Sequence, residues 1–172
     1  MANSKNIIEF TLAYNRYKAQ VYNYVLKMIS NKMVCEDIIQ NVFLKLYENL
    51  ENIRNKSSIQ FWIFRTARNE VYTYFRTKKV RVDQFNVEDT DDLEIDDGGN
   101  LAVAFEMKEV KELILKELES MPYEQKEIYL LKEYGGLSYK EISSIMNIDE
   151  NLVKSRLFKV RQKLARRIAR VY

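Results

Sequence analysis

NLVKSRLFKVRQKLARRIARVY, the stretch from Asn151 to Tyr172, decides the fold of the second half of the chain. Its 22 residues include eight basic side chains and no acidic one. Four apolar residues follow one another at spacings of four, three and four: Val153, Leu157, Val160 and Leu164. Because an α-helix advances about 100° per residue, these four share one narrow stripe. The stretch therefore predicts a helix with one side for a core and a basic remainder for a negatively charged partner.

A shorter helix is predicted directly before this one. Ser138 suits its N-cap, and Glu141 three residues later completes a capping box. Asn147 suits a left-handed turn, and Asp149 suits the N-cap of the last helix. Two helices joined by a tight turn, the second of them basic, are typical of a helix-turn-helix that enters a DNA groove.

Apolar residues at helical spacing also fill the first half of the chain. They predict three helices, from about Ile7 to Ile29, Met33 to Leu50 and Ser58 to Lys79, with Ser58 as the N-cap of the third. Three helices of this length can bury one core between them. The chain holds only four glycines and one proline, so few residues interrupt the helical periods. We therefore expect an all-α protein.

Charge is distributed unevenly along the chain, although the net charge is only +3. Residues 1–80 carry thirteen basic and six acidic residues, whereas residues 81–100 carry one basic and eight acidic. Two basic zones separated by acidic sequence indicate two separate contacts with polyanions. The acidic stretch is poor in large apolar residues and predicts a flexible linker. We expect two small helical domains, 1–80 and 102–172, joined by a linker at 81–101.

The composition excludes several kinds of site. There is no histidine, so no His-ligated metal site and no His-based triad can form. Cys35 is the single cysteine, which excludes an internal disulfide, and we expect it to be buried. No long apolar run or signal-peptide pattern is present, so we expect a cytoplasmic protein without membrane insertion. Acid/base side chains do not converge, and we expect neither an enzyme nor a cofactor or metal.

Basic and aromatic side chains alternate along the third predicted helix. Its aromatic residues are Phe61, Trp62, Phe64, Tyr72, Tyr74 and Phe75. Cations interleaved with rings suit melted DNA, because bases stack on the rings while the cations neutralise the backbone. We nevertheless expect most of these rings, Trp62 included, to lie in the core.

The last helix presents a different set of side chains opposite its apolar stripe. Phe158 lies among polar and basic residues there, which is costly unless the ring meets a partner such as a thymine methyl group. Side chains on this face would read base edges, and the flanking cations would hold phosphates. A solvated basic helix is the alternative interpretation.

Four segments resemble bacterial sigma factors. CEDIIQNVFLKLY (Cys35 to Tyr47) resembles region 2.2, and FWIFRTARN (Phe61 to Asn69) resembles the region that follows it. LSYKEI (Leu137 to Ile142) and VKSRLFKVR (Val153 to Arg161) resemble region 4. Regions 2 and 4 with only a short linker between them are similar to an extracytoplasmic-function (ECF) sigma factor. Members often carry Gly at the positions of Asn147 and Asn151 and Thr at that of Leu152, departures that leave the −35 preference open. Many also carry Ile at that of Thr66, which concerns only the local core.

This resemblance implies three sets of contact residues. The set that would dock on the β′ clamp of core RNA polymerase is Asp37, Gln40, Asn41 and Lys45. The set that would hold a flipped −10 base and the melted strand is Asn52, Arg54, Asn55, Lys56, Arg65, Arg68, Asn69 and Arg76. The set that would bind the −35 element is Asn151, Lys154, Ser155, Arg156, Phe158, Lys159 and Gln162.

The resemblance also implies partners: core RNA polymerase through its β′ clamp and β flap, promoter DNA, and an anti-sigma factor. We expect a factor that directs promoter-specific initiation and promotes −10 melting. Two alternatives stay open at this point. One is a stand-alone helix-turn-helix regulator that uses residues 101–172 without polymerase. The other is a sigma-like interaction protein that does not initiate transcription.

Overall fold

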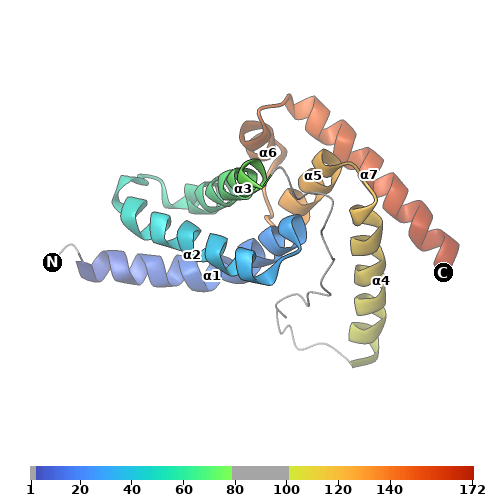
Figure 1. Cartoon of the computed structure of the whole chain (residues 1–172), viewed down its shortest axis with the longest axis horizontal. Helices are drawn as coiled ribbons and strands as arrows, with labels where there is room; N and C mark the ends of the chain where they lie inside the picture. Colours follow the sequence, from blue (N-terminus) through green and yellow to red (C-terminus); the bar gives the residue numbers. More distant parts are fainter. Residues whose placement is uncertain (1–2, 79–100) are drawn as a thin grey trace. The chain divides into compact units, whose positions relative to one another are not determined.

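The computed structural model describes residues 3–78 and 101–172. The chain divides into two compact units, Met1–Glu94 and Ile95–Tyr172. Within the described residues both units are built from helices and the turns between them, which confirms the all-α prediction (Figure 1). The acidic stretch predicted as a linker lies outside the described residues, apart from Leu101.

The first unit is a bundle of three helices: α1 (Asn3–Ile29), α2 (Lys32–Asn49) and α3 (Ile59–Thr77). Each of them packs against the other two (Figure 1). Two short 3-10 turns, η1 (Leu50–Asn52) and η2 (Lys56–Ser58), lie between α2 and α3. The sequence predicted the three helices and a loop between the last two, but not the two 3-10 turns in that loop.

The core of this bundle is rich in aromatic side chains. Tyr24 of α1 and Phe64 of α3 are both fully buried, with ring centroids 5.6 Å apart. Nearer the start of α1, Phe10 meets Tyr47 of α2 edge-on at 5.5 Å. Edge-to-face pairs of this kind add to the free energy gained from burial. The first pair joins the second half of α1 to α3, and the second pair joins the first half of α1 to the end of α2.

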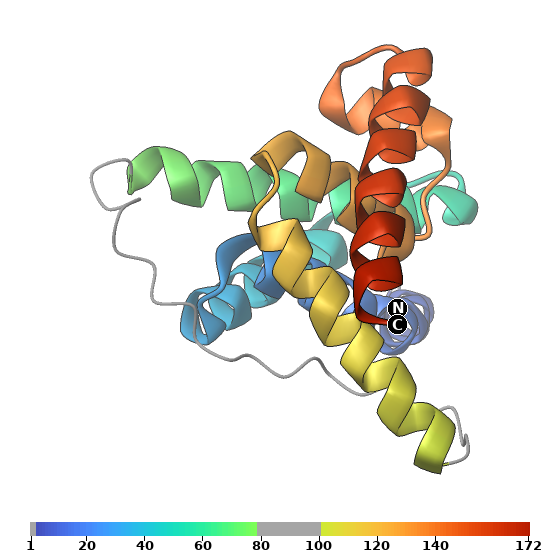
Figure 2. The ribbon, with the colours of Figure 1, turned by 90° about the vertical axis from the view of Figure 1, so that its right-hand side faces the viewer.

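The second unit holds four helices: α4 (Leu101–Glu119), α5 (Tyr123–Glu133), α6 (Tyr139–Met146) and α7 (Glu150–Val171). The helix α7 packs against the other three, and its C-terminal half runs along α4 (Figure 2). Its predicted apolar stripe is buried, from Val153 at 0% exposure to Leu164 at 5%. The unit is therefore assembled around one side of α7.

Local signals at the helix ends of this unit were predicted correctly. Ser138 and Glu141 form the capping box of α6, and Asn147 ends α6 in the left-handed conformation with φ 53°. Asp149 caps α7 by accepting from the backbone N–H of Asn151 at 3.2 Å. The turn after α5 needs Gly135, where a Cβ would lie only 2.4 Å from the backbone oxygen of Leu131.

Ser58 occupies the predicted N-cap position of α3, but its side chain does not cap the helix. Its hydroxyl donates back to the carbonyl of Asn55 at 2.6 Å, and its side chain makes no capping hydrogen bond to α3. The reason is η2, which leads into α3 directly and takes its own cap from Asn55. A serine before a helical period signals a cap but does not reveal that another turn precedes it.

Candidate nucleic-acid interfaces

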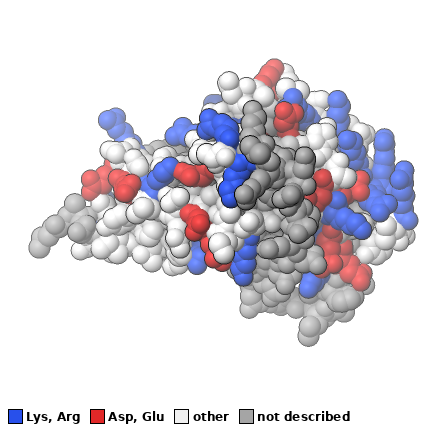
Figure 3. Space-filling view, viewed as in Figure 1, with Lys and Arg blue, Asp and Glu red and all other residues white. Residues whose placement is uncertain are grey.

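The side of α7 opposite the buried stripe is an open, basic surface. Asn151, Ser155, Phe158, Lys159 and Gln162 are all exposed, and Phe158 keeps 62% of its surface accessible. Lys and Arg side chains gather along α7 at the right of Figure 3. This face can present both base-reading groups and phosphate-binding cations to one groove.

The cations at the edges of this face are held by neighbouring groups. Lys154 lies 3.7 Å from Glu150 and over the ring of Tyr139, while Arg156 is half-buried. Arg161, which the sequence places among the flanking cations, pairs instead with Glu133 of α5 at 3.2 Å.

Arg161 belongs to the joint between α5 and α7. Burial opposes its charge, but hydrogen bonds to Glu133 and Tyr139 raise the pKa of Arg161 above its ordinary value. This ion pair joins α7 to α5, so Arg161 already has a partner within its own unit.

The turn between α6 and α7 is closed by short hydrogen bonds. Ser143 donates its hydroxyl to the carbonyl of Ile148 at 2.6 Å, and the backbone N–H of Ile148 donates to the Ser143 carbonyl at 3.2 Å. With Asn147 left-handed between them, this turn fixes how α7 leaves α6. The pair thus has the form of the predicted helix-turn-helix.

A second surface runs along α3, on the side away from the bundle core. Trp62, Arg65, Asn69, Tyr72 and Arg76 follow one another at spacings of three, four, three and four, so they share one stripe. Arg65, Asn69 and Arg76 are exposed, and both rings are half-buried. We call these five residues the α3 stripe.

Two arginines of this helix also lie over aromatic rings. Arg68 sits 4.3 Å above Tyr72, and Arg65 sits 5.5 Å from the centre of Phe61.

The expectation that most rings of α3 lie in the core was wrong, because only Phe64 is buried. Helical spacing puts Trp62 and Tyr72 opposite the core residues, whereas counting apolar residues does not distinguish the two sides.

The loop from Leu50 to Ser58 lies beside the start of α3. Leu50 and Ile53 are buried and anchor it, while Asn52 and Arg54 are exposed on either side of Ile53. Two other predicted DNA contacts of this loop already have partners. Asn55 accepts hydrogen bonds from the backbone and the hydroxyl of Ser57 at 3.1 and 2.7 Å. Lys56 pairs with Glu9 of α1 at 2.9 Å.

The polar side of α2 forms a third surface. Asp37, Gln40 and Asn41 are exposed there, and Lys45, exposed as well, pairs with Glu70 of α3 at the edge of the surface. The sequence analysis missed Leu44, which lies one helical turn from Gln40 and Asn41 and is 57% exposed. The sequence did contain a signal for this residue, because Leu44 is apolar but falls outside the helical spacing of the buried residues of α2.

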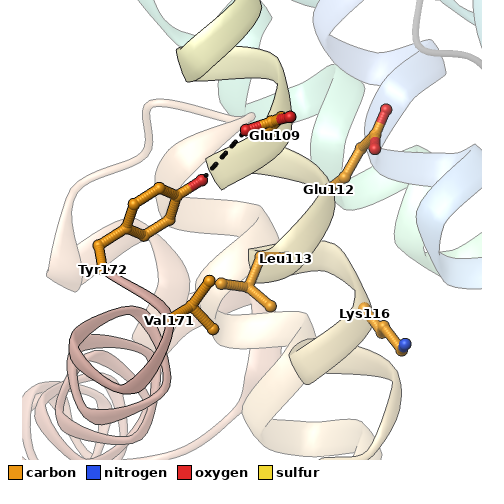
Figure 4. Close-up of a pocket in the computed structure, with 6 residues that line it drawn as sticks. All are labelled: Glu109, Glu112, Leu113, Lys116, Val171 and Tyr172. Atoms are coloured by element: carbon orange, nitrogen blue, oxygen red, sulfur yellow. Dashed lines mark hydrogen bonds between the residues drawn. The ribbon is translucent and has the colours of Figure 1, made fainter.

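The hollow in Figure 4 lies between α4 and the end of α7. It is lined by Glu109, Glu112, Leu113, Lys116, Val171 and Tyr172, and the hydroxyl of Tyr172 donates to Glu109 at 3.4 Å. Two carboxylates against one ammonium give it no excess of positive charge, so this hollow does not extend the basic face of α7. Among the described residues, no acidic or Cys cluster is arranged to hold a metal, and no helix is long and apolar enough to cross a membrane.

Comparison with known proteins gives the family of both units. Residues 13–81 match the model of Sigma-70 region 2, and residues 111–164 match that of Sigma-70, region 4. The ECF RNA polymerase sigma factor SigM of Bacillus subtilis is 35% identical over 159 residues, which cover 88% of this chain and 90% of SigM. The ECF RNA polymerase sigma-E factor of Escherichia coli K12 is 27% identical over 168 residues, which cover 92% of this chain and 86% of that protein.

Solved structures share the fold at lower identity. The sigma factor RpoE from Bartonella quintana, in complex with the anti-sigma factor NepR, matches with a TM-score of 0.69 at 20% identity, covering 93% of this chain and 96% of RpoE. CnrH, in complex with the cytosolic domain of CnrY, matches with a TM-score of 0.61 at 16% identity, covering 93% and 87%. The two region models, at opposite ends of the chain, and the identity to SigM along most of its length together show that this chain belongs to the ECF RNA polymerase sigma factors.

Proposed function

We propose that this chain binds core RNA polymerase, directs it to promoters through the exposed face of α7, and opens the −10 element with the α3 stripe and the loop from Leu50 to Ser58. The α3 stripe is the observation that carries the proposal. It interleaves exposed cations with half-buried rings on the side of α3 opposite its buried residues. A protein that binds only duplex DNA has little use for such a surface, whereas a melted strand offers bases to stack and phosphates to pair.

Asn69 is the best candidate for holding an extruded base. It is exposed near the middle of the α3 stripe, and its amide offers both a donor and an acceptor to a base edge. Flipping a base out of the duplex costs a few kcal/mol, which a pocket must offset by stacking and hydrogen bonding. The half-buried rings of Trp62 and Tyr72 supply stacking surface on the same stripe.

The remaining contacts follow from the other two surfaces. On α7, Asn151, Ser155, Phe158 and Gln162 would face base edges in the −35 groove, and Lys154, Arg156 and Lys159 would bind phosphates. On α2, Asp37, Gln40 and Asn41 would dock on the β′ clamp of the polymerase. We add Leu44 to that surface, because an exposed apolar side chain among polar ones is typical of an interface.

A run-off assay with core polymerase and a promoter library tests the proposal as a whole. Once a promoter is found, Asn69→Ala should assemble with polymerase and bind the closed promoter but lose permanganate reactivity of thymines near the start site. A pre-melted bubble template should restore part of the activity, because the cost of flipping is then mostly removed. Asn15→Ala, an exposed asparagine of α1 outside the stripe, is the matched control and should open promoters normally.

Two results would contradict this proposal, one for Asn69 and one for the whole function. Normal opening by Asn69→Ala would remove this residue from base capture. Specific operator binding by the free chain, with no promoter opened by wild type and polymerase, would favour the stand-alone regulator.

An anti-sigma factor belongs to the same proposal as a partner. It is supported by the shared fold with RpoE, whose structure is a complex with the anti-sigma factor NepR. Such a partner should block assembly of this chain with core polymerase and so reduce run-off product in proportion to its occupancy.

A further inference from the structure

The first turns of α1 reach the candidate −10 loop at two points. The side-chain amide of Asn6 donates to the Glu51 carboxylate at 2.6 Å. The carboxylate of Glu9 lies 2.9 Å from the ammonium of Lys56. Both loop residues are distant from α1 in sequence, so these contacts exist only in the folded bundle. They connect the start of α1, which has no predicted DNA-contact residue, to the loop, which has four of them.

The ammonium of Lys56 also closes the loop on itself. Besides its pair with Glu9, it donates to the backbone carbonyl of Leu50 at 3.2 Å. One cation thus holds the start of the loop, its own position near the end, and α1 together, using two of its three donors. The hydrogen bond from Lys56 lowers the pKa of the Glu9 carboxyl below its ordinary value, as expected for a carboxylate held against an ammonium.

This geometry separates Lys56 from its neighbours in the loop. Asn52 and Arg54 flank the buried Ile53, and they project from the segment that the Lys56 ammonium spans. If the ammonium left Glu9 and Leu50 to bind a phosphate, the loop would lose its closure at the moment when a base had to be received. Holding a binding loop in its bound shape lowers the ordering cost of binding.

We propose that Glu9 and Lys56 form a clamp that fixes the loop from Leu50 to Ser58 in the orientation that receives a −10 base. The inference rests on the proposed function, since it concerns how the same loop is positioned. Lys56 is then a positioning residue that acts through Asn52 and Arg54, in place of the direct DNA contact implied by the family resemblance. Asn6 and Glu51 add a second tether at the start of the loop.

Four variants in holoenzyme test the clamp on the promoter identified by run-off transcription. They are Glu9→Gln, Lys56→Gln, the double neutral variant, and the reversed pair Glu9→Lys with Lys56→Glu. Lys5→Gln is the matched control, because it removes the other cation near Glu9, at 4.0 Å, without touching the loop. The measurements are the rate of duplex opening, discrimination between matched and mutated −10 single strands, and the salt dependence of promoter binding.

The clamp predicts a similar loss in both single variants, roughly fivefold in opening rate and in −10 discrimination, which is the scale of an exposed charge pair. The double neutral variant should be no worse than either single one, because the second change removes a pair that is already broken. The reversed pair should recover the part of the loss that comes from the broken ion pair, but not the part that comes from the bond to the Leu50 carbonyl, because a carboxylate at position 56 cannot donate. The salt dependence should stay at the wild-type value throughout.

A direct phosphate contact gives a different pattern and would overturn the clamp. Lys56→Gln alone would then be impaired, the magnitude of the salt slope would fall by about one, and charge reversal would make the defect worse. Normal opening by Glu9→Gln beside an active wild type also overturns it and leaves the proposed function intact. A wild type that opens no promoter overturns the proposed function and the clamp with it.

Discussion

At the scale of single residues, Phe158 makes the sharpest prediction. It is exposed on α7, beside the fully buried Leu157. Phe158→Ala should keep the stability of the fold but lose about 1–3 kcal/mol of discrimination between matched and mutated −35 elements. Leu157→Ala should instead lower the free energy of unfolding by about 2–5 kcal/mol. Run-off competition between promoters and urea unfolding measure the two effects.

The control for this prediction is a cation on the same helix. Arg166 is exposed on α7, so Arg166→Gln should weaken binding to all sequences alike and reduce the salt dependence. Phe158→Ala that behaves like Arg166→Gln, with no change in sequence preference, would contradict base readout by the ring.

Cys35 gives a second prediction, about pH and reactivity. It is fully buried, and burial, with a smaller contribution from Glu36, raises the pKa of its thiol to about 12. The native protein should therefore resist thiol alkylation at pH 8 and react only when unfolded. The stabilisation from holding the neutral thiol is complete below the unfolded pKa of about 9, and it is lost as pH rises through about 12. Alkylation followed by mass spectrometry tests this, and rapid labelling of the native chain would contradict it.

At the scale of helices and turns, Asn147 is the position where backbone conformation decides the outcome. Its φ of 53° is left-handed, which glycine adopts freely and β-branched residues adopt poorly. Asn147→Gly should leave stability unchanged or slightly raised, and Asn147→Val should lower the free energy of unfolding by roughly 1–2 kcal/mol. Denaturant midpoints of the two variants measure the difference. Equal midpoints would mean that the turn can adopt another conformation.

The helices of the chain could be predicted from the sequence because their signals are local. The capping box of α6 and the apolar stripe of α7 depend on residues only three or four positions apart, and both were found. The turns η1 and η2 were missed, since short polar segments between helices carry no period. The position of Ser58 at the start of α3 was predicted correctly, but its hydroxyl donates to the carbonyl of Asn55 and does not cap α3.

For the candidate sites, the sequence predicted which side chains are exposed but not which of them already have partners. The sequence placed Asp37, Asn69 and Phe158 away from the core, and each is exposed. Which cations already have partners could not be predicted, because Glu70 lies 25 residues from Lys45 and meets it only in the folded bundle. The pair of Lys56 with Glu9 is of the same kind. Contacts between distant segments leave no spacing in the sequence to detect.

At the scale of the whole molecule, the prediction concerns assembly with polymerase. Asp37 is exposed on α2, so Asp37→Arg should leave helix content intact while weakening association with core polymerase. Glu36→Arg is the matched control, since it makes the same charge change about 100° further round the helix. Pull-down with core enzyme and circular dichroism measure binding and folding. Equal binding by wild type and a folded Asp37→Arg would remove this side of α2 from the polymerase interface.

The division of α7 into a buried stripe and an exposed face has a consequence for how such genes diverge. Substitutions at Ser155, Phe158 or Gln162 cost little folding free energy, because these side chains pack against nothing in the core. With the proposed role of this face in reading the −35 element, a duplicated copy can thus acquire a new promoter preference in a few mutational steps, each of which leaves a folded protein. The helical frame is inherited while the set of genes under its control drifts.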